Sequence, residues 1–162
     1  MFISWLLASL VSSGMLENAD AEFVSLKTQL ESYGFQVNLV IPPDFSLPEQ
    51  QSDFLRRSVR KPYGVLNTRK KAIWINPIVF ELGNSKAVLI HEAVHAAQYC
   101  AGDGKIKTIG IDLEPIPQAR PLFNRYLNLH SRAVEKEAYA VQTQSNSYEL
   151  VKFLLEQHCS HQ

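Results

Sequence analysis

Several features are scarce or missing in this 162-residue chain, and each absence narrows the range of functions. Only two cysteines are present, Cys100 and Cys159, and they lack C-x-x-C spacing, which disfavours a cysteine-based zinc or redox site. The 16 basic residues balance the 16 acidic ones, so the chain lacks the basic surface that nucleic acid binding requires. No apolar run reaches the roughly 20 residues of a transmembrane helix. Internal repeats and low-complexity tracts are also missing.

The length and composition of the chain fit one globular domain. Hydrophobic residues make up 46% of the chain and charged residues 20%, both ordinary for a folded protein of this length. The two cysteines leave two interpretations open. Cys100 and Cys159 each end a segment with helical periodicity, so a helix-to-helix disulfide in an oxidising compartment is one interpretation, and a pair of buried free thiols is the other.

The N-terminus differs from the rest. Residues 2–11 form an apolar run of the size of a signal-peptide core, and Ala19-Asp20-Ala21 has the small-x-small form of a cleavage site. No basic residue precedes the run, and residues 12–20 are long and polar for such a peptide. We expect residues 1–21 to be a signal peptide or an N-terminal anchor, with export to the periplasm, a lumen or the medium, or membrane association through residues 2–11. The alternative is a first helix of a cytoplasmic domain.

Hydrophobic periodicity predicts an α+β domain over residues 22–162, in which a small antiparallel sheet, a strand plus a hairpin, packs on a helical majority. The expected helices cover residues 17–33, 77–82, 86–100, 121–129, 131–144 and 148–158. The expected strands cover residues 35–41, 63–66 and 72–75, the last two forming the hairpin. Residues 44–62 are expected to be irregular or briefly helical, and residues 105–118 to form a long connection.

The helix at 86–100 carries the pattern His91-Glu92-Ala93-Val94-His95, an H-E-x-x-H motif. Positions i and i+4 lie on one helix face, so both imidazoles can reach one metal ion, and Glu92 projects about 100° round the helix from His91. The flanking residues are apolar, so the helix is expected in the centre of the domain. Polar side chains buried there need partners, which a metal ion supplies. A core helix with an accidental motif is the alternative.

Catalytic zinc usually has three protein ligands, and the motif supplies two. A third histidine at the metzincin spacing would fall at residue 101, which is Ala101. A glutamate on the helix at 131–144 is the remaining common solution, and that helix offers Glu135 and Glu137.

Around Glu135 the chain resembles the gluzincin-type metallopeptidases of the zincin superfamily. Their second helix carries a glutamate followed three residues later by a small residue. Several members have S-R-x-x-E-x-x-A-D there, which Ser131, Arg132, Glu135 and Ala138 match, whereas Tyr139 stands in place of the aspartate. The resemblance implies a zincin-like fold with a central H-E-x-x-H helix, Zn²⁺ held by His91, His95 and Glu135, and Glu92 as the catalytic base. It also implies that extended peptide pairs with a strand above the metal, for which residues 72–75 are the segment in place.

Motif and periodicity disagree about the third ligand. The motif favours Glu135, whereas periodicity puts Glu137 at the centre of the buried stripe. In the second case Glu135 would pair with Arg132. Glu114 is a third candidate, weakened by the proline that follows it.

The expected function is a zinc-dependent peptidase that hydrolyses peptide bonds of a peptide or protein substrate, with zinc-bound water activated by Glu92. Tyr126, His130 and Tyr139 are candidate hydrogen-bond donors to the oxyanion, and Gln98 is a hydrogen-bonding group on the face of the two histidines. Two alternatives stay open: a non-catalytic, zinc-stabilised binding domain, and a helical interaction module whose motif is accidental.

Overall fold

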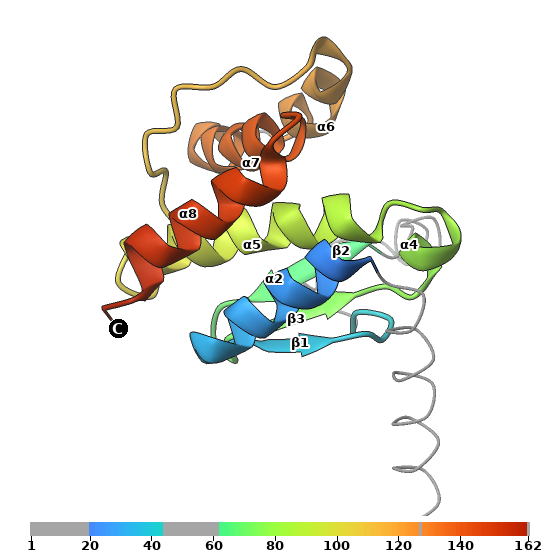
Figure 1. Cartoon of the computed structure of the whole chain (residues 1–162). Coiled ribbons are helices and arrows are strands. Elements are labelled where there is room, and N and C mark those ends of the chain that lie inside the picture. The colour runs from blue at the N-terminus through green and yellow to red at the C-terminus, as the bar shows by residue number, and fades with distance from the viewer. Residues whose placement is uncertain (1–19, 44–61, 127, 162) are drawn as a thin grey trace, which may run out of the picture.

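The computed structural model describes residues 20–43, 62–126 and 128–161, which form a three-stranded sheet and a majority of helices (Figure 1). The elements are α2 (Ala21–Ser32), β1 (Gln36–Asn38), β2 (Gly64–Asn67), β3 (Ala72–Ile75), α4 (Ile78–Glu81), α5 (Ser85–Ala101), the 3-10 helix η1 (Pro117–Ala119), α6 (Arg120–Asn124), α7 (Leu129–Gln142) and α8 (Ser147–Cys159). The predicted α+β class is confirmed.

Local signals fix both ends of α2 and the start of α7. The Asp20 carboxylate accepts the backbone N–H of Phe23 at 2.7 Å and caps the start of α2. Gly34 follows that helix with φ +83°, a conformation that favours glycine. The helix predicted over 121–129 is shorter in the structure, since α6 ends at Asn124 and α7 begins only after Asn128, whose side chain accepts the N–H groups of His130 and Ser131.

The sheet has the order β1-β3-β2 and is mixed. The β2–β3 hairpin is antiparallel as predicted, but β1 pairs with β3 in parallel, with Val37 opposite Ile73. The prediction of a wholly antiparallel sheet is therefore wrong. The most apolar strand, β3, takes the central place between β1 and β2 and runs in the same direction as β1, as suits a strand buried on both faces. The first strand is also shorter than the predicted 35–41, because its partner β3 has only four residues.

The central position of β3 has a further consequence. Both of its edges are occupied, by β1 on one side and by β2 on the other. It therefore offers no free backbone edge to an extended peptide, and the expectation that residues 72–75 pair with substrate is wrong. Of the two hairpin strands, β2 lies at the edge of the sheet.

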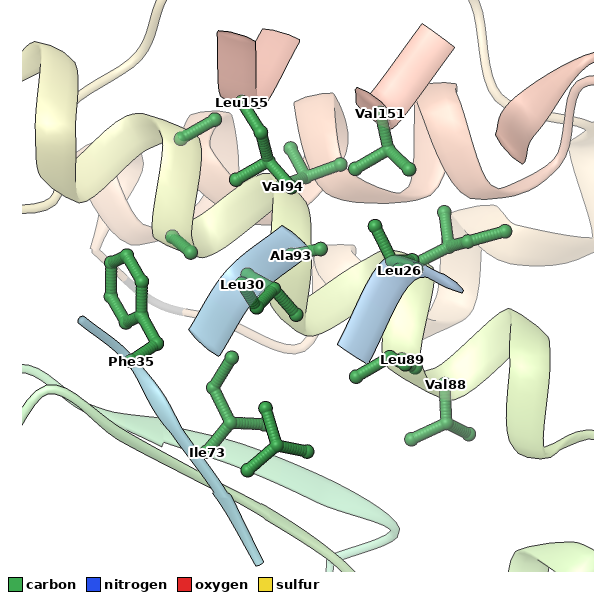
Figure 2. Close-up of a cluster of buried hydrophobic side chains, with 14 of the residues drawn as sticks. Leu26, Leu30, Phe35, Ile73, Val88, Leu89, Ala93, Val94, Val151 and Leu155 are labelled. Atoms are coloured by element: carbon green, nitrogen blue, oxygen red, sulfur yellow. The ribbon is translucent and has the colours of Figure 1, made fainter. Parts of the chain in front are cut away.

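Helix α5 lies at the centre of the domain, between the sheet on one side and α7 and α8 on the other (Figure 1). It also contacts α2 and α4. Figure 2 shows the core around it, where Leu89 lies on the side of α5 toward the sheet and Val94 lies beside Leu155 of α8. Because α5 is covered from several directions, it can be apolar nearly all round, as its sequence predicts.

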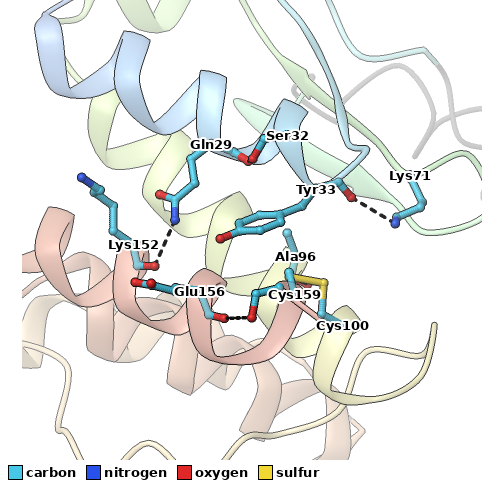
Figure 3. The surroundings of a disulfide bond; sticks show 10 residues. Gln29, Ser32, Tyr33, Lys71, Ala96, Cys100, Lys152, Glu156 and Cys159 are labelled. Atoms are coloured by element: carbon cyan, nitrogen blue, oxygen red, sulfur yellow. Dashed lines mark hydrogen bonds between the residues drawn. A yellow bond between two sulfur atoms is a disulfide. The ribbon is translucent and has the colours of Figure 1, made fainter. Parts of the chain in front are cut away.

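A disulfide between Cys100 and Cys159 joins the C-terminal ends of α5 and α8 (Figure 3). Their Cα atoms are 5.2 Å apart. Of the two interpretations of the cysteines, the structure thus has the disulfide. Nearby, the Gln29 amide donates to the Lys152 carbonyl at 3.2 Å and links α2 to α8. These contacts hold the end of the central helix in place.

Two predicted features lie outside the described residues. They are the apolar run at 2–11, with most of the predicted 1–21 segment, and the irregular segment at 44–61. Among the helices that the structure describes, none has the length and apolar character needed to cross a bilayer.

We expect the disulfide to stabilise the fold, because it closes a loop in the unfolded chain and so lowers the conformational entropy of that chain. The double variant Cys100→Ser/Cys159→Ser should lose about 2–4 kcal/mol of unfolding free energy, because the bond closes a segment of 59 residues. Urea unfolding followed by circular dichroism measures the change. Reducing the wild-type protein should lower its stability by a similar amount, and an unchanged midpoint under reduction would contradict the prediction.

Candidate metal centre

Helices α5 and α7 bring His91, His95 and Glu135 together. The Nε2 atoms of the two histidines are 3.2 Å apart. One oxygen of Glu135 lies 3.2 Å from His91 Nε2 and the other lies 3.6 Å from His95 Nε2. The three side chains are largely buried, with exposed fractions of 12%, 9% and 17%. They form a group with the ligand types and spacing of a metal site.

The spacing can be compared with that of a real ion. For zinc bonds of about 2.0–2.1 Å, neighbouring ligand atoms of a tetrahedron are roughly 3.3–3.4 Å apart. The distances from His91 Nε2 to His95 Nε2 and to Glu135 Oε2, both 3.2 Å, are close to that value, and the 3.6 Å from His95 Nε2 is to the other carboxylate oxygen, Oε1. Two imidazole nitrogens that face each other with lone pairs also repel unless a proton or a metal ion lies between them. The arrangement therefore fits a bound cation.

Each histidine is held by a glutamine through its other ring nitrogen. His95 Nδ1 lies 2.7 Å from Oε1 of Gln98, one turn further along α5. His91 Nδ1 lies 3.0 Å from Oε1 of Gln142 on α7. An amide oxygen only accepts, so both Nδ1 atoms donate and both Nε2 atoms keep a lone pair for a metal. Such outer partners fix ligand orientation.

His95 and Glu135 shift the pKa values of one another in opposite directions. Burial alone would lower the pKa of His95, but the hydrogen bond with Glu135 and the charges of Glu92 and Glu135 raise it to about 8. Burial alone would raise the pKa of Glu135, but hydrogen bonds with both histidines and their charges lower it below its ordinary value. The site thus stabilises a positive charge between its imidazoles and its carboxylate.

Glu92 lies beside this group, next to the edge strand β2. It is buried, with 6% of its surface exposed, and burial raises the pKa of its carboxyl, an effect that the charges of His91 and His95 only partly oppose. A backbone hydrogen bond from Leu66 reaches the carboxylate. At Gly64 a Cβ would lie 2.8 Å from Glu92 Cγ, so only glycine lets β2 approach α5 this closely.

The structure separates the two candidate glutamates of α7. Glu135 faces the histidines, whereas the carboxylate of Glu137 accepts hydrogen bonds from Gln98 and from backbone N–H groups of residues 109–111. Periodicity did place Glu137 on the buried stripe, and it is buried, with 8% exposed. The third candidate, Glu114, is exposed and pairs with Lys136 at 2.6 Å.

Two tyrosines lie beside the metal group. The ring of Tyr139 packs against that of His91, with centroids 4.6 Å apart, and burial followed by the charge of Glu135 raises its pKa to about 12. Burial is the main cause that raises the pKa of Tyr126, and the charge of Glu135 adds to the effect. His130 instead donates to the Ile106 carbonyl at 3.2 Å.

One alternative predicted that Arg132 pairs with Glu135, but among the described residues the structure has no such pair. Its guanidinium donates to the backbone carbonyl of Tyr126 at 2.9 and 3.2 Å and holds the turn between α6 and α7. The Glu135 carboxylate instead faces the two histidines.

Sequence reasoning missed three contributors: Gln142, Gly64 and the amides of residues 109–111. Gln142 follows Glu135 by seven residues, which puts both on one face of α7, and this spacing was a usable signal. A glycine inside a strand pattern also indicates a close backbone approach. The amides of residues 109–111 belong to an irregular connection, where no periodic signal exists.

Comparisons of the chain with protein-family models, with curated proteins and with solved structures found no match. A function for this protein is therefore inferred from the arrangement of its own residues.

We expect Glu135→Gln to weaken metal binding more than a change in an outer partner, which typically costs about 10–100-fold. The reason is that the variant removes the negative charge of the carboxylate whose two oxygens lie 3.2 Å from His91 Nε2 and 3.6 Å from His95 Nε2. Titration with Zn²⁺ against a chromophoric chelator measures the affinity. Glu114→Gln is the matched control, since it removes an exposed carboxylate outside the group. Equal affinities for wild type and Glu135→Gln would rule out Glu135 as a ligand.

We expect Gly64→Ala to destabilise the protein by about 1–3 kcal/mol, the usual cost of overpacking. Its Cβ would lie 2.8 Å from both Glu92 Cγ and Val88 Cγ1, so either β2 or α5 must shift. Thermal and urea denaturation of the two proteins measure the difference. A variant as stable as the wild type would show that the strand has room to spare.

Proposed function

We propose that the protein is a zinc-dependent peptidase of the gluzincin type, with a zincin-like domain. The observation that carries the proposal is the convergence of His91, His95 and Glu135 from two helices, with Glu92 buried at their side. Two histidines and one carboxylate form a three-ligand set that is typical of catalytic zinc, which keeps a fourth position open.

The residues fit zinc in type as well as in number. Both Nε2 atoms are free to bind, because the Nδ1 atoms are committed to Gln98 and Gln142. Zinc, when bound there, supplies a Lewis acid that polarises the scissile carbonyl and makes water a nucleophile near neutral pH. His91, His95 and Glu135 would hold it.

Glu92 is suited to the proton transfers of amide hydrolysis. As general base it accepts a proton from the attacking water, and as general acid it then delivers this proton to the leaving amine. Its burial supports this role, because a carboxyl whose pKa is raised accepts a proton more readily near neutral pH. Tyr126 and Tyr139, whose pKa values the charge of Glu135 helps to raise, are the candidate donors to the oxyanion beside the metal group.

A peptide substrate fits best along β2. This strand pairs only with β3 among the described strands, and an extended chain would bind to those backbone groups of its other edge that Glu92 does not use. Leu66 on β2 donates to Glu92, which places this edge beside the base. The substrate would thus lie next to both Glu92 and the metal group. Export or anchoring through residues 1–21 stays a prediction.

The second candidate function is a non-catalytic domain that zinc stabilises for binding a partner. The same three ligands favour it, since they would hold a structural ion equally well. Glu92 argues for catalysis, because a structural site gains nothing from a buried carboxyl that costs desolvation free energy.

The decisive variant is Glu92→Gln. It should bind zinc as the wild type does and lose peptide cleavage, because the amide cannot take a proton from water. Cleavage of a mixed peptide library, read by mass spectrometry, measures the activity, and Glu114→Gln serves as the matched surface control. Unchanged cleavage by Glu92→Gln would end the peptidase proposal. Less than about half an equivalent of zinc in the mildly purified wild type would end the metal proposal.

A further inference from the structure

The environment of Glu137 is unusual for a buried residue that is not a metal ligand. Its Oε1 accepts the backbone N–H of Gly110 at 2.7 Å and those of Ile109 and Ile111 at 3.1 Å each. Its Oε2 accepts the amide of Gln98 at 2.9 Å and lies 2.9 Å from Ile109 N. Three successive N–H groups that converge on one anion form a nest, and the positive φ of Gly110, +76°, is the conformation such a nest needs.

These contacts fix the orientation of the Gln98 amide. The Gln98 Nε2 atom has two hydrogens and two partners, Glu137 Oε2 at 2.9 Å and the Val134 carbonyl at 3.1 Å. Both partners only accept hydrogen bonds. The amide oxygen must therefore point the other way, toward His95 Nδ1 at 2.7 Å. Gln98 is fully buried, so no water can take either role.

The orientation of Gln98 in turn fixes the tautomer of His95. Because an amide oxygen cannot donate, His95 Nδ1 must carry the hydrogen, and the lone pair is left on Nε2. That is the nitrogen that faces His91 and Glu135. For His91 the structure shows only the contact of Nδ1 with Gln142. For His95 the contacts continue through Gln98 to Glu137 on α7, and they determine which ring nitrogen carries the hydrogen.

We propose that Glu137 is a positioning residue that acts through Gln98 to hold His95 in the tautomer that can bind metal. The inference rests on the metal site of the proposed function but not on peptidase activity. It also gives the connection between α5 and α7 a role, because the amides of residues 109–111 hold the Glu137 carboxylate in place.

Wild-type protein provides the first test. Nitrogen-15 NMR distinguishes an imidazole nitrogen that carries a hydrogen from one that does not. Metal-free protein, at a pH raised until the His95 ring is neutral by its nitrogen shifts, should show the hydrogen on Nδ1. A hydrogen on Nε2 of the wild-type ring would overturn the proposal. The tautomer can be measured even if the wild type binds no zinc. Failure of the proposed metal site and failure of the proposed action of Glu137 through Gln98 are therefore distinguishable.

The second test reverses the donor and acceptor roles between residue 137, Gln98 and His95. In Glu137→Gln the amide oxygen should stay on the backbone nest and the NH₂ group should face Gln98. Gln98 would then turn its oxygen toward residue 137 and its NH₂ toward His95, which moves the hydrogen to Nε2. We expect the Zn²⁺ affinity to fall about 10–100-fold, with the matching change in the His95 nitrogen shifts.

A second substitution should restore a hydrogen-bond acceptor opposite His95 Nδ1. Gln98→Glu alone puts two carboxylates within 2.9 Å of each other and should also weaken Zn²⁺ binding. Combined with Glu137→Gln, it gives His95 an acceptor again, so the double variant should bind Zn²⁺ more tightly than either single variant. Recovery should be partial, because the Val134 carbonyl loses its donor. Additive losses would instead indicate ordinary structural damage and would overturn the proposal.

Controls separate this effect from loss of fold. Glu114→Gln removes a carboxylate from the same connection without touching Gln98, and it should leave both the Zn²⁺ affinity and the His95 shifts unchanged. Circular dichroism of each metal-free variant checks folding. A folded Glu137→Gln variant with wild-type affinity and wild-type His95 shifts would show that Glu137 does not act through Gln98. Should that variant fail to fold, the tautomer of the wild type still decides the matter.

Discussion

The burial of ionisable side chains on an otherwise apolar helix is the constraint on which the rest of this structure depends. Helix α5 crosses the centre of the domain, where a polar group without a partner costs on the order of several kcal/mol. His91, Glu92 and His95 each meet a polar group of another element or of the next turn. The surrounding core and the disulfide at Cys100 hold the helix in the position where those partners can reach it.

Three parts of the fold supply the polar partners of the site, and each of them fixes a different side chain. Helix α7 supplies Glu135 and Gln142 to the ring nitrogens of the histidines. Strand β2 brings the Leu66 N–H to Glu92, which is possible because Gly64 has no side chain. The connection before η1 supplies the amides that hold Glu137. The chemistry of the site therefore depends on the packing of the whole domain rather than on α5 alone.

Sequence reasoning succeeds where a regular backbone fixes the geometry. The relation of His91, Glu92 and His95 follows from the period of one helix, and the apolar run of β3 predicts its burial. Sequence cannot choose between Glu135 and Glu137, because both lie near the inner face of α7 and the choice depends on amides from an irregular connection. Nor does it show that β3 enters between β1 and β2, since strand order depends on which strand buries the most apolar surface in three dimensions.

The departure from the gluzincin motif at Tyr139 has a structural counterpart. The tyrosine ring packs on His91, and Gln142, three residues further on, provides the acceptor for its Nδ1. Both histidines thus face neutral amides, whereas a carboxylate partner would raise the basicity of the ring. In the proposed zinc centre, Glu135 would then be the only anionic ligand. A divalent ion so held would keep a net positive charge at the site, which favours its action on a carbonyl oxygen, and the buried Glu92 would be the nearest group able to take up the proton released.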